Sequence, residues 1–264
     1  MAKSIPGPTD AKRSPRNIQD GTTALTASPP PAITYSETVW DTRIQARYGV
    51  PSKDDVLKKA TEFLVNWESV DEVPDWPGGQ SGVTWGVGWD AGQHTVEELR
   101  ADWAKLGDTV LKRLEKTIGK QGVEAETLAS KLDDIHISQE LSLSVFKDKT
   151  LPDYYDQTTQ AFSGLTVLPL GIQVALISLV YNRGASTGTD SFSFDSRWEM
   201  RQIQRAVQQR DLLTIYQSIG SMIRLWKGTD IEKGMTNRRH AEQALVLPYV
   251  QPFLNGFRMM APIA

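Results

Sequence analysis

The segment LGIQVALISLVY, residues 170 to 181, is the longest apolar run of the 264-residue chain. Its apolar side chains occupy nearly every position around the helical turn. A helix of this kind is stable only when other elements cover it on all sides. It is also well short of the roughly 20 residues that cross a bilayer. The run therefore predicts a helix buried at the centre of a helical domain, and no membrane span.

Patterns typical of amphipathic helices surround this segment. Apolar residues recur with helical spacing over 52–67, and Ser52 is placed to cap that helix. Thr95 with Glu98 forms a capping box at the start of a helix that we expect to continue to Leu114. Further helices are expected at 123–134, 137–146, 152–162, 195–209, 211–225 and 236–246, with breaks at Gly184, Gly228 and Gly234. The domain is thus predicted to be mostly α.

The exception is the glycine-rich segment SGVTWGVGWDAGQ, residues 81–93. Its glycines make it a poor long strand, so we expect residues 83–89 to pair only briefly, in a small hairpin. The preceding segment VDEVPDWPGGQSG, residues 70–82, has the composition of turns. The predicted fold class is α+β, mostly α, with one small β-hairpin sheet.

The first 50 residues differ from the rest of the chain. Residues 1 to 35 hold six of the fourteen prolines, including PPPA at 29–32. Such a composition buries too little apolar surface to order itself alone. We expect a disordered proline-rich arm over 1–50, either a plain tail or a segment for docking or delivery, in front of one domain over 51–264. The first residues have no apolar core of the kind that signal peptides carry, so no signal peptide is expected.

Composition excludes several classes of function. The net charge of −3 gives no broad basic field, so nucleic acid is not an expected partner. The chain has no cysteine, which excludes disulfides, thiolate metal sites and a cysteine nucleophile. His94, His136 and His240 lack the spacing of a helical metal site, so neither a metal nor a cofactor is expected. The chain has no GxSxG motif of a serine hydrolase.

Glu68 is the first candidate for catalysis. It ends the helix predicted over 52–67 and follows Trp67. The negative end of the helix dipole and a neighbouring aromatic ring would both raise the pKa of its carboxyl group. A carboxyl group that stays protonated near neutral pH can serve as a general acid. The alternative is a solvated charge at a helix end.

Thr84 and Asp90 are the second candidates. They are six residues apart, so in an extended hairpin both side chains would lie on one face. Gly86 and Gly88 lie between them and would leave a gap where a ligand approaches the backbone. One acid, one carboxylate and a hydroxyl group suit glycoside hydrolysis. The alternative is that Asp90 only forms a turn.

Three segments resemble known muramidases. GVTWGVGWDAGQHT, residues 82–95, resembles the signature of the pesticin-type muramidases and, more distantly, a strand of phage lysozymes. ALISLVYNRGAS, residues 175–186, resembles their central helix. GMTNRRHAEQALV, residues 234–246, resembles their closing helix, in which we expect Arg238 and Arg239 to brace the fold or pair with acids on neighbouring helices. The resemblance implies a lysozyme-like fold, with the sheet lining an active-site cleft.

The resemblance also implies an activity and a catalytic set. The activity is cleavage of the β-1,4 bond between N-acetylmuramic acid and N-acetylglucosamine in peptidoglycan. Glu68 would be the acid, and Asp90 with Thr84 would position or activate water. Phage lysozymes place their aspartate before the threonine, where this chain has Gly78. Asp75 is therefore the alternative to Asp90 as second carboxylate.

Four further residues are candidates for substrate binding. Trp85 and Trp89 either stack on sugar faces or fill the core. Asn182 and Arg183 either line the glycan groove or belong to a helix C-terminal cap, with Gly184 as its left-handed residue.

The expected biological role is that of an antibacterial effector or toxin. Such a protein would be made in the cytoplasm and act in the periplasm or cell wall of a target bacterium after delivery by a non-classical route. Its partners would be glycan strands, a delivery machinery that engages the arm, and an immunity protein that plugs the groove. A phage endolysin and a bacteriocin are alternatives with the same activity. A lytic transglycosylase and an inactive peptidoglycan-binding or interaction protein are alternatives of another class.

Overall fold

The computed structural model describes residues 48–188 and 194–259, and over these the chain is mostly helical with one small antiparallel sheet. This confirms the predicted α+β class. The helices are α2 (Lys53–Leu64), α3 (Val96–Asp102), α4 (Asp108–Leu114), α5 (Val123–Ala129), α6 (Gln139–Val145), α7 (Leu151–Ala161), α8 (Leu170–Arg183), α9 (Trp198–Gln209), α10 (Leu212–Ser221) and α11 (Glu232–Met259). The strands are β1 (Asp71–Asp75), β2 (Thr84–Gly86) and β3 (Trp89–Asp90). Residues 1–47 of the predicted arm lie outside the described part of the chain.

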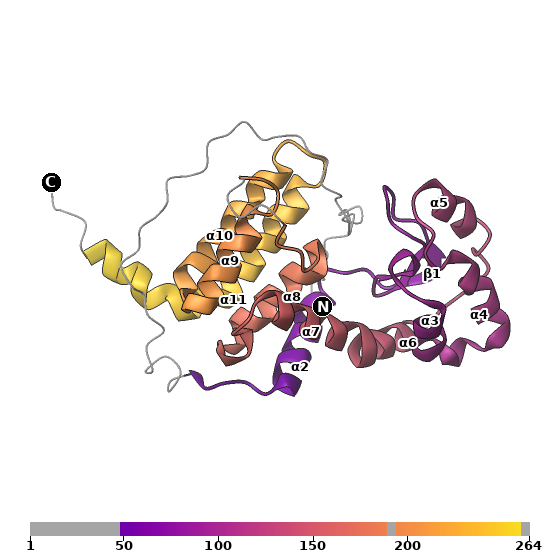
Figure 1. Cartoon of the computed structure of the whole chain (residues 1–264), viewed down its shortest axis with the longest axis horizontal. Coiled ribbons are helices and arrows are strands. Elements are labelled where there is room, and N and C mark those ends of the chain that lie inside the picture. Colours follow the sequence, from indigo (N-terminus) through magenta and orange to yellow (C-terminus); the bar gives the residue numbers. More distant parts are fainter. Residues whose placement is uncertain (1–47, 189–193, 260–264) are drawn as a thin grey trace, which may run out of the picture.

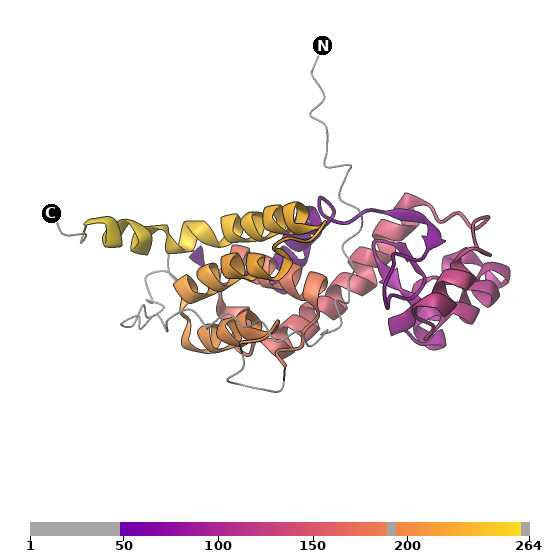
Figure 2. The ribbon, with the colours of Figure 1, turned by 90° about the horizontal axis from the view of Figure 1, so that it is seen from above.

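Two lobes make up the described chain (Figure 1). We call α2 and α7–α11 the helical lobe, and β1–β3 with α3–α5 the sheet lobe. Helices α6 and α7 run from one lobe to the other, which both views show (Figure 2). Each lobe has its own apolar core, and a third cluster of buried residues lies between α2, α7 and α8.

Helix α8 is the centre of the helical lobe. Every residue from Gly171 to Asn182 is buried. Helices α2, α7 and α11 pack against it, and its remaining surface shares a core with α9 and α10. The prediction of a central buried helix is confirmed. Over the described ranges, no helix combines the length and the hydropathy needed to span a membrane.

The predicted caps are present, but one predicted helix is divided. Ser52 Oγ accepts a hydrogen bond from the Asp55 amide at 3.1 Å, and Thr95 with Glu98 forms the complete capping box. The prediction of one continuous helix from Thr95 to Leu114 is wrong, because the structure has two α-helices there. Gly107 has a φ of 79°, which interrupts the helix and separates α3 from α4.

Two predicted helices are joined in the structure. Residues Phe146–Thr150 form a π-helical turn that connects α6 directly to α7. Pro152 has no amide hydrogen to donate to the carbonyl four residues earlier, and the wider turn falls where that bond would form. The prediction of separate helices ending at 146 and starting at 152 is therefore corrected to one rod.

Helix α11 is longer than predicted. The expected break at Gly234 is wrong, because the helix starts at Glu232 and passes through this glycine. It also continues through Pro248 and Pro252. Proline cannot donate a helical hydrogen bond, so Pro252 leaves the carbonyl of Pro248 without its usual partner.

Tyr48 supplies that partner. Its hydroxyl group donates to the Pro248 carbonyl at 3.3 Å, and its ring packs edge-on against Tyr249 with centroids 4.8 Å apart. The point where the described chain begins is thus attached to the far part of α11.

The sheet has the order β1-β2-β3, with both pairs antiparallel. The hairpin of β2 and β3 confirms the prediction for 83–89, and its turn contains Gly86 and Gly88 with φ values of 61° and 70°. Strand β1 lies in the segment that we interpreted as a turn. It is an edge strand, a position in which a proline such as Pro74 need not remove a hydrogen bond between strands. The Glu72 carbonyl of this strand accepts a hydrogen bond from the Ile137 amide at 2.7 Å.

The hairpin tip joins the two lobes. Val87 is buried in the cluster that α2, α7 and α8 share. The Tyr181 hydroxyl group of α8 donates to the Val87 carbonyl at 2.6 Å. This contact fixes β2 and β3 relative to the central helix.

Gly86→Ala tests how the hairpin is packed. A Cβ atom at Gly86 would lie 2.7 Å from Cη2 of Trp103, whereas one at Gly79, with a similar φ of 62°, would meet nothing within 4 Å. Gly79→Ala should lose about 1–2 kcal/mol of unfolding free energy through its left-handed backbone alone. Gly86→Ala should lose a further 1–3 kcal/mol, roughly, through overpacking. Urea denaturation measures both, and equal losses would contradict the packing argument.

Candidate active site

Glu68 lies where the chain leaves the helical lobe for the sheet lobe. Its amide donates to the Leu64 carbonyl at 3.0 Å, which extends α2 by one turn. Its side chain is 11% exposed, and its Oε1 lies 2.8 Å from Nη1 of Arg238. A cation at this distance stabilises the ionised carboxylate. The helix end and Trp67 are expected to favour the protonated form of Glu68, and Arg238 acts against that effect.

Arg238 is held on several sides. Its Nη2 donates to the carbonyl and to the Oγ of Ser178, both at 3.3 Å, and its Nε lies 3.5 Å from Oε1 of Glu242. Arg239 is fully buried and pairs with Glu242 at 2.7 Å. Burial, only partly offset by Glu242, lowers the pKa of Arg239 to about 10. The prediction that these arginines pair with acids on neighbouring helices is confirmed for Arg238, through Glu68, whereas Arg239 pairs within α11.

Thr84 has an aspartate opposite it on each neighbouring strand. Asp90 lies directly opposite Thr84 in the pairing of β2 with β3, and Asp75 lies opposite it in the pairing of β1 with β2. Directly opposite residues share one face of a sheet, so the prediction that Thr84 and Asp90 lie on one face is confirmed. Thr84 is buried, and its Oγ1 donates to the Gly82 carbonyl at 3.3 Å. Asp75 is exposed and remains the alternative second carboxylate.

Asp90 organises the backbone around it. Its Oδ1 accepts from the amides of Gly82 at 2.9 Å and Gly92 at 2.8 Å. A Cβ atom on Gly82 would lie 2.3 Å from this same oxygen, so only glycine fits there. Two amide donors stabilise the ionised form of a carboxyl group. Asp90 is thus a turn former, as the alternative interpretation held, and also a fixed carboxylate.

The gap expected at the hairpin glycines is not available at Gly86. The Trp103 ring and the Cβ atom of Ser142 occupy the space beside it. The prediction of a ligand-sized opening at Gly86 is therefore wrong, because core side chains fill it.

Trp85 and Trp89 lie in the core of the sheet lobe. They are 0% and 2% exposed, and their ring centroids are 4.7 Å apart. The Trp89 ring stacks on His94 at 4.1 Å, and its Nε1 donates to Asp102. The prediction that Trp85 and Trp89 stack on sugar faces is therefore corrected: both fill the core.

Asn182 and Arg183 end the central helix. Asn182 is buried. Arg183 donates to the Ser196 carbonyl and lies over the Trp226 ring, 5.3 Å from its centroid. Gly184 follows with a φ of 76° and a ψ of 163°, so it ends the helix with a positive φ but not in the left-handed conformation expected for a cap. These contacts assign Arg183 to bracing the loop after α8, while a groove-lining role of Asn182 stays a prediction.

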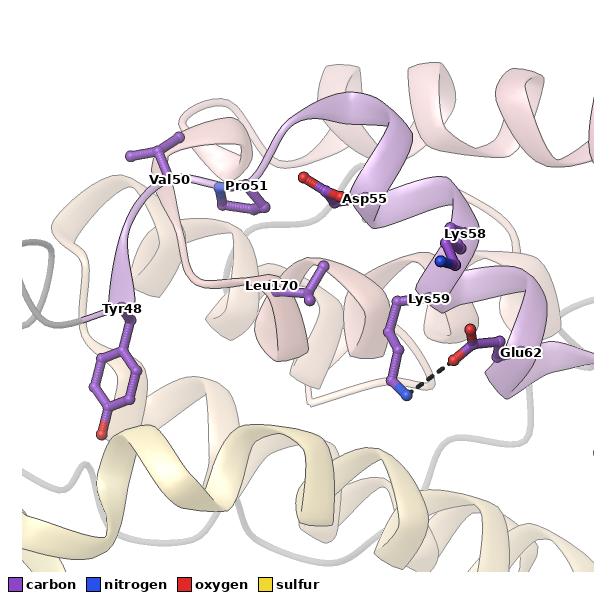
Figure 3. Close-up of a pocket in the computed structure, with 8 residues that line it drawn as sticks. All are labelled: Tyr48, Val50, Pro51, Asp55, Lys58, Lys59, Glu62 and Leu170. Carbon is purple, nitrogen blue, oxygen red and sulfur yellow. Dashed lines mark hydrogen bonds and ion pairs between the residues drawn. The ribbon is translucent and has the colours of Figure 1, made fainter.

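A pocket of about 370 Å³ lies elsewhere in the helical lobe (Figure 3). It is an open hollow beside α2, and its lining residues are Tyr48, Val50, Pro51, Asp55, Lys58, Lys59, Glu62 and Leu170. The lining includes none of the catalytic candidates Glu68, Thr84 and Asp90.

No protein-family model matches the chain, and no curated protein matches it. In the part of the chain that the structure describes, no three histidine, aspartate or glutamate side chains are grouped so that they could hold a metal ion. The site therefore has to be interpreted from its own geometry.

Substitutions at Asp90 should separate its two hydrogen bonds from its charge. Asp90→Ala leaves the buried amide of Gly82 without an acceptor and should lose about 2–4 kcal/mol of unfolding free energy. Asp90→Asn keeps an acceptor oxygen and should lose roughly half as much. The exposed Glu72, changed to Ala, is the control and should shift stability by less than about 0.5 kcal/mol. Equal stability of Asp90→Ala and the control would refute the bracing role of Asp90.

Proposed function

We propose that the chain is a peptidoglycan hydrolase with a lysozyme-like fold, an N-acetylmuramidase that cleaves the β-1,4 bond after N-acetylmuramic acid. The observation that carries the proposal is the position of Glu68. An arginine holds this carboxyl group where the chain passes from α2 to β1, immediately before the sheet on which Thr84 faces Asp90. The proposed site takes one carboxyl group from the helical lobe and a carboxylate and a hydroxyl group from the sheet lobe.

The chemistry requires two carboxyl groups in different states. Glu68 is the general acid that protonates the leaving glycosidic oxygen. The two amides that donate to Oδ1 of Asp90 favour its ionised form, which suits the positioning or activation of water. Thr84, opposite Asp90 in the sheet, assists it.

The three segments that resemble muramidases support the proposal through their contacts. Residues 82–95 contain the hairpin with Thr84 and Asp90. Residues 175–186 lie in and after α8, and Ser178 of this helix contacts Arg238. Residues 234–246 lie in α11 and supply Arg238, the partner of Glu68. The second and third segments thus meet at Arg238, and Tyr181 of α8 links the first segment to them through its hydrogen bond to the Val87 carbonyl.

One observation favours a second candidate, an inactive peptidoglycan-binding or interaction protein on the same fold. Thr84 is 3% and Asp90 6% exposed, which leaves little surface for a reacting water. A lytic transglycosylase would need the glutamate but no catalytic water. The reaction products distinguish all three.

For the biological setting we propose an antibacterial effector whose partners are glycan strands, a delivery machinery and an immunity protein. A phage endolysin is the alternative. The hydrolase should lyse a Gram-negative host when it is directed to the periplasm and not when it is retained in the cytoplasm. Growth unaffected in both cases would contradict a toxic role.

Digestion of purified peptidoglycan tests the activity. The wild type should release muropeptides with reducing ends, and Glu68→Gln should lower the rate by about 10²–10⁴, because proton donation by the acid is lost. Asp90→Asn should lower it strongly as well, whereas Asp75→Asn should not. Mass analysis of the released muropeptides identifies the ends.

Glu62→Gln is the matched control, since Glu62 lies on the same helix with an exposed side chain paired to Lys59. It should keep wild-type activity. An active Asp90→Asn together with an inactive Asp75→Asn would transfer the second role to Asp75. Products with 1,6-anhydro ends would indicate a transglycosylase, and no products would indicate a binding protein.

A further inference from the structure

A buried charge cluster lies directly behind Glu68. It consists of Arg238, Arg239 and Glu242 on α11, with Ser178 of α8. The side chains of Arg239 and Glu242 are fully buried, and that of Arg238 is 5% exposed. Such groups are costly to bury and need mutual compensation. With Glu68, the cluster contains two arginines and two glutamates.

Glu242 is the centre of the cluster. Its Oε1 accepts from Ser178 Oγ at 2.6 Å and from Arg239 Nη2 at 2.7 Å, and it lies 3.5 Å from Arg238 Nε. Arg238 therefore lies between two carboxylates, Glu242 on one side and Glu68 at 2.8 Å on the other. Whatever changes the charge at Glu242 changes how strongly Arg238 holds Glu68 in its ionised form.

This arrangement bears on a conflict in the proposed site. A general acid must hold a proton, whereas an arginine at 2.8 Å favours loss of that proton. The negative charge of Glu242 offsets part of this influence, while the positive charge of Arg239 acts in the opposite direction. The charges of the cluster, rather than the helix end alone, then set the proton affinity of Glu68.

We propose that Glu242 is a positioning residue that, through Arg238, keeps Glu68 able to carry a proton, with Arg239 as the opposing charge. The inference that this matters for catalysis rests on the proposed function. The influence of Glu242 on Glu68 is argued through the guanidinium group of Arg238, which contacts both carboxylates.

Three neighbours of the cluster in the described part of the chain have contacts of their own. From α8, Ser178 is the neighbour, and Arg183 at the end of that helix lies over Trp226, whose ring Arg239 also approaches at 5.6 Å. Arg224 of the adjacent 3₁₀ segment Met222–Trp226 is paired with Glu199 of α9. These contacts leave Glu242 as the carboxylate that faces both Arg238 and Arg239.

Charge variants of the cluster test the proposal. Glu242→Gln should lower the apparent pKa of Glu68 by about 0.5–1 unit, and Arg239→Gln should raise it by a similar amount. The double variant should return close to the wild-type value, because both charges are removed. The measurement is the carbon-13 titration of the Glu68 carboxyl group, assigned by its absence in Glu68→Gln. The alkaline limb of kcat/KM on peptidoglycan should move in the same directions.

Opposite shifts in the two single variants are the outcome that supports the proposal. No shift, or shifts of the same sign, would overturn it, since a purely structural disturbance has no reason to follow the sign of the charge. If Glu242→Gln does not fold, Arg239→Gln alone decides through the direction of its shift. If the wild type does not cleave peptidoglycan while the titrations shift as expected, the proposed function fails and the coupling between Glu242 and Glu68 stands.

Discussion

The enclosure of α8 is the constraint on which the rest of the structure depends. Its residues from Gly171 to Asn182 have no exposed face, so its backbone and side chains are stable only inside a shell of other helices. Helices α2, α7 and α11 cover it and share its core with α9 and α10. Because α2 and α11 pack on the same central helix, Glu68 and Arg238 meet although 170 residues separate them in the chain.

Polar groups on α8 turn this enclosure into a scaffold for the site. Tyr181 donates to the carbonyl at the hairpin tip, and Ser178 contacts the arginine that holds Glu68. Each is a hydroxyl group buried in a mostly apolar helix. A buried hydroxyl group needs a partner, so each of these residues specifies which element packs at its position. The central helix thus determines where both halves of the proposed site lie.

Local patterns in the sequence predict the elements well and the contacts between them poorly. The apolar run of α8, the capping box at Thr95 and the glycine-rich hairpin each have a physical signature within a few residues. Strand β1 has none, because its proline and acidic residues are typical of turns and only pairing with β2 makes it a strand.

The burial of Trp85 and Trp89 depends in the same way on Trp103 and the rest of the sheet-lobe core, which a short segment does not reveal. Glu242 follows Arg238 and Arg239 at helical pair spacing, and that signal could have identified it. The pairing of Arg238 with Glu68 depends on the tertiary fold.

The hydrogen bond between Tyr48 and the Pro248 carbonyl determines at which end of the molecule a segment before Tyr48 is attached. It fastens the beginning of the described chain to α11, at the end of the helical lobe that lies away from the sheet lobe (Figures 1 and 2). Anything joined before Tyr48, whether a natural segment or an experimental tag, is tethered at that end. Immobilisation there would leave the sheet lobe on the side away from the supporting surface, and the length of the tether would set how far the sheet lobe can reach.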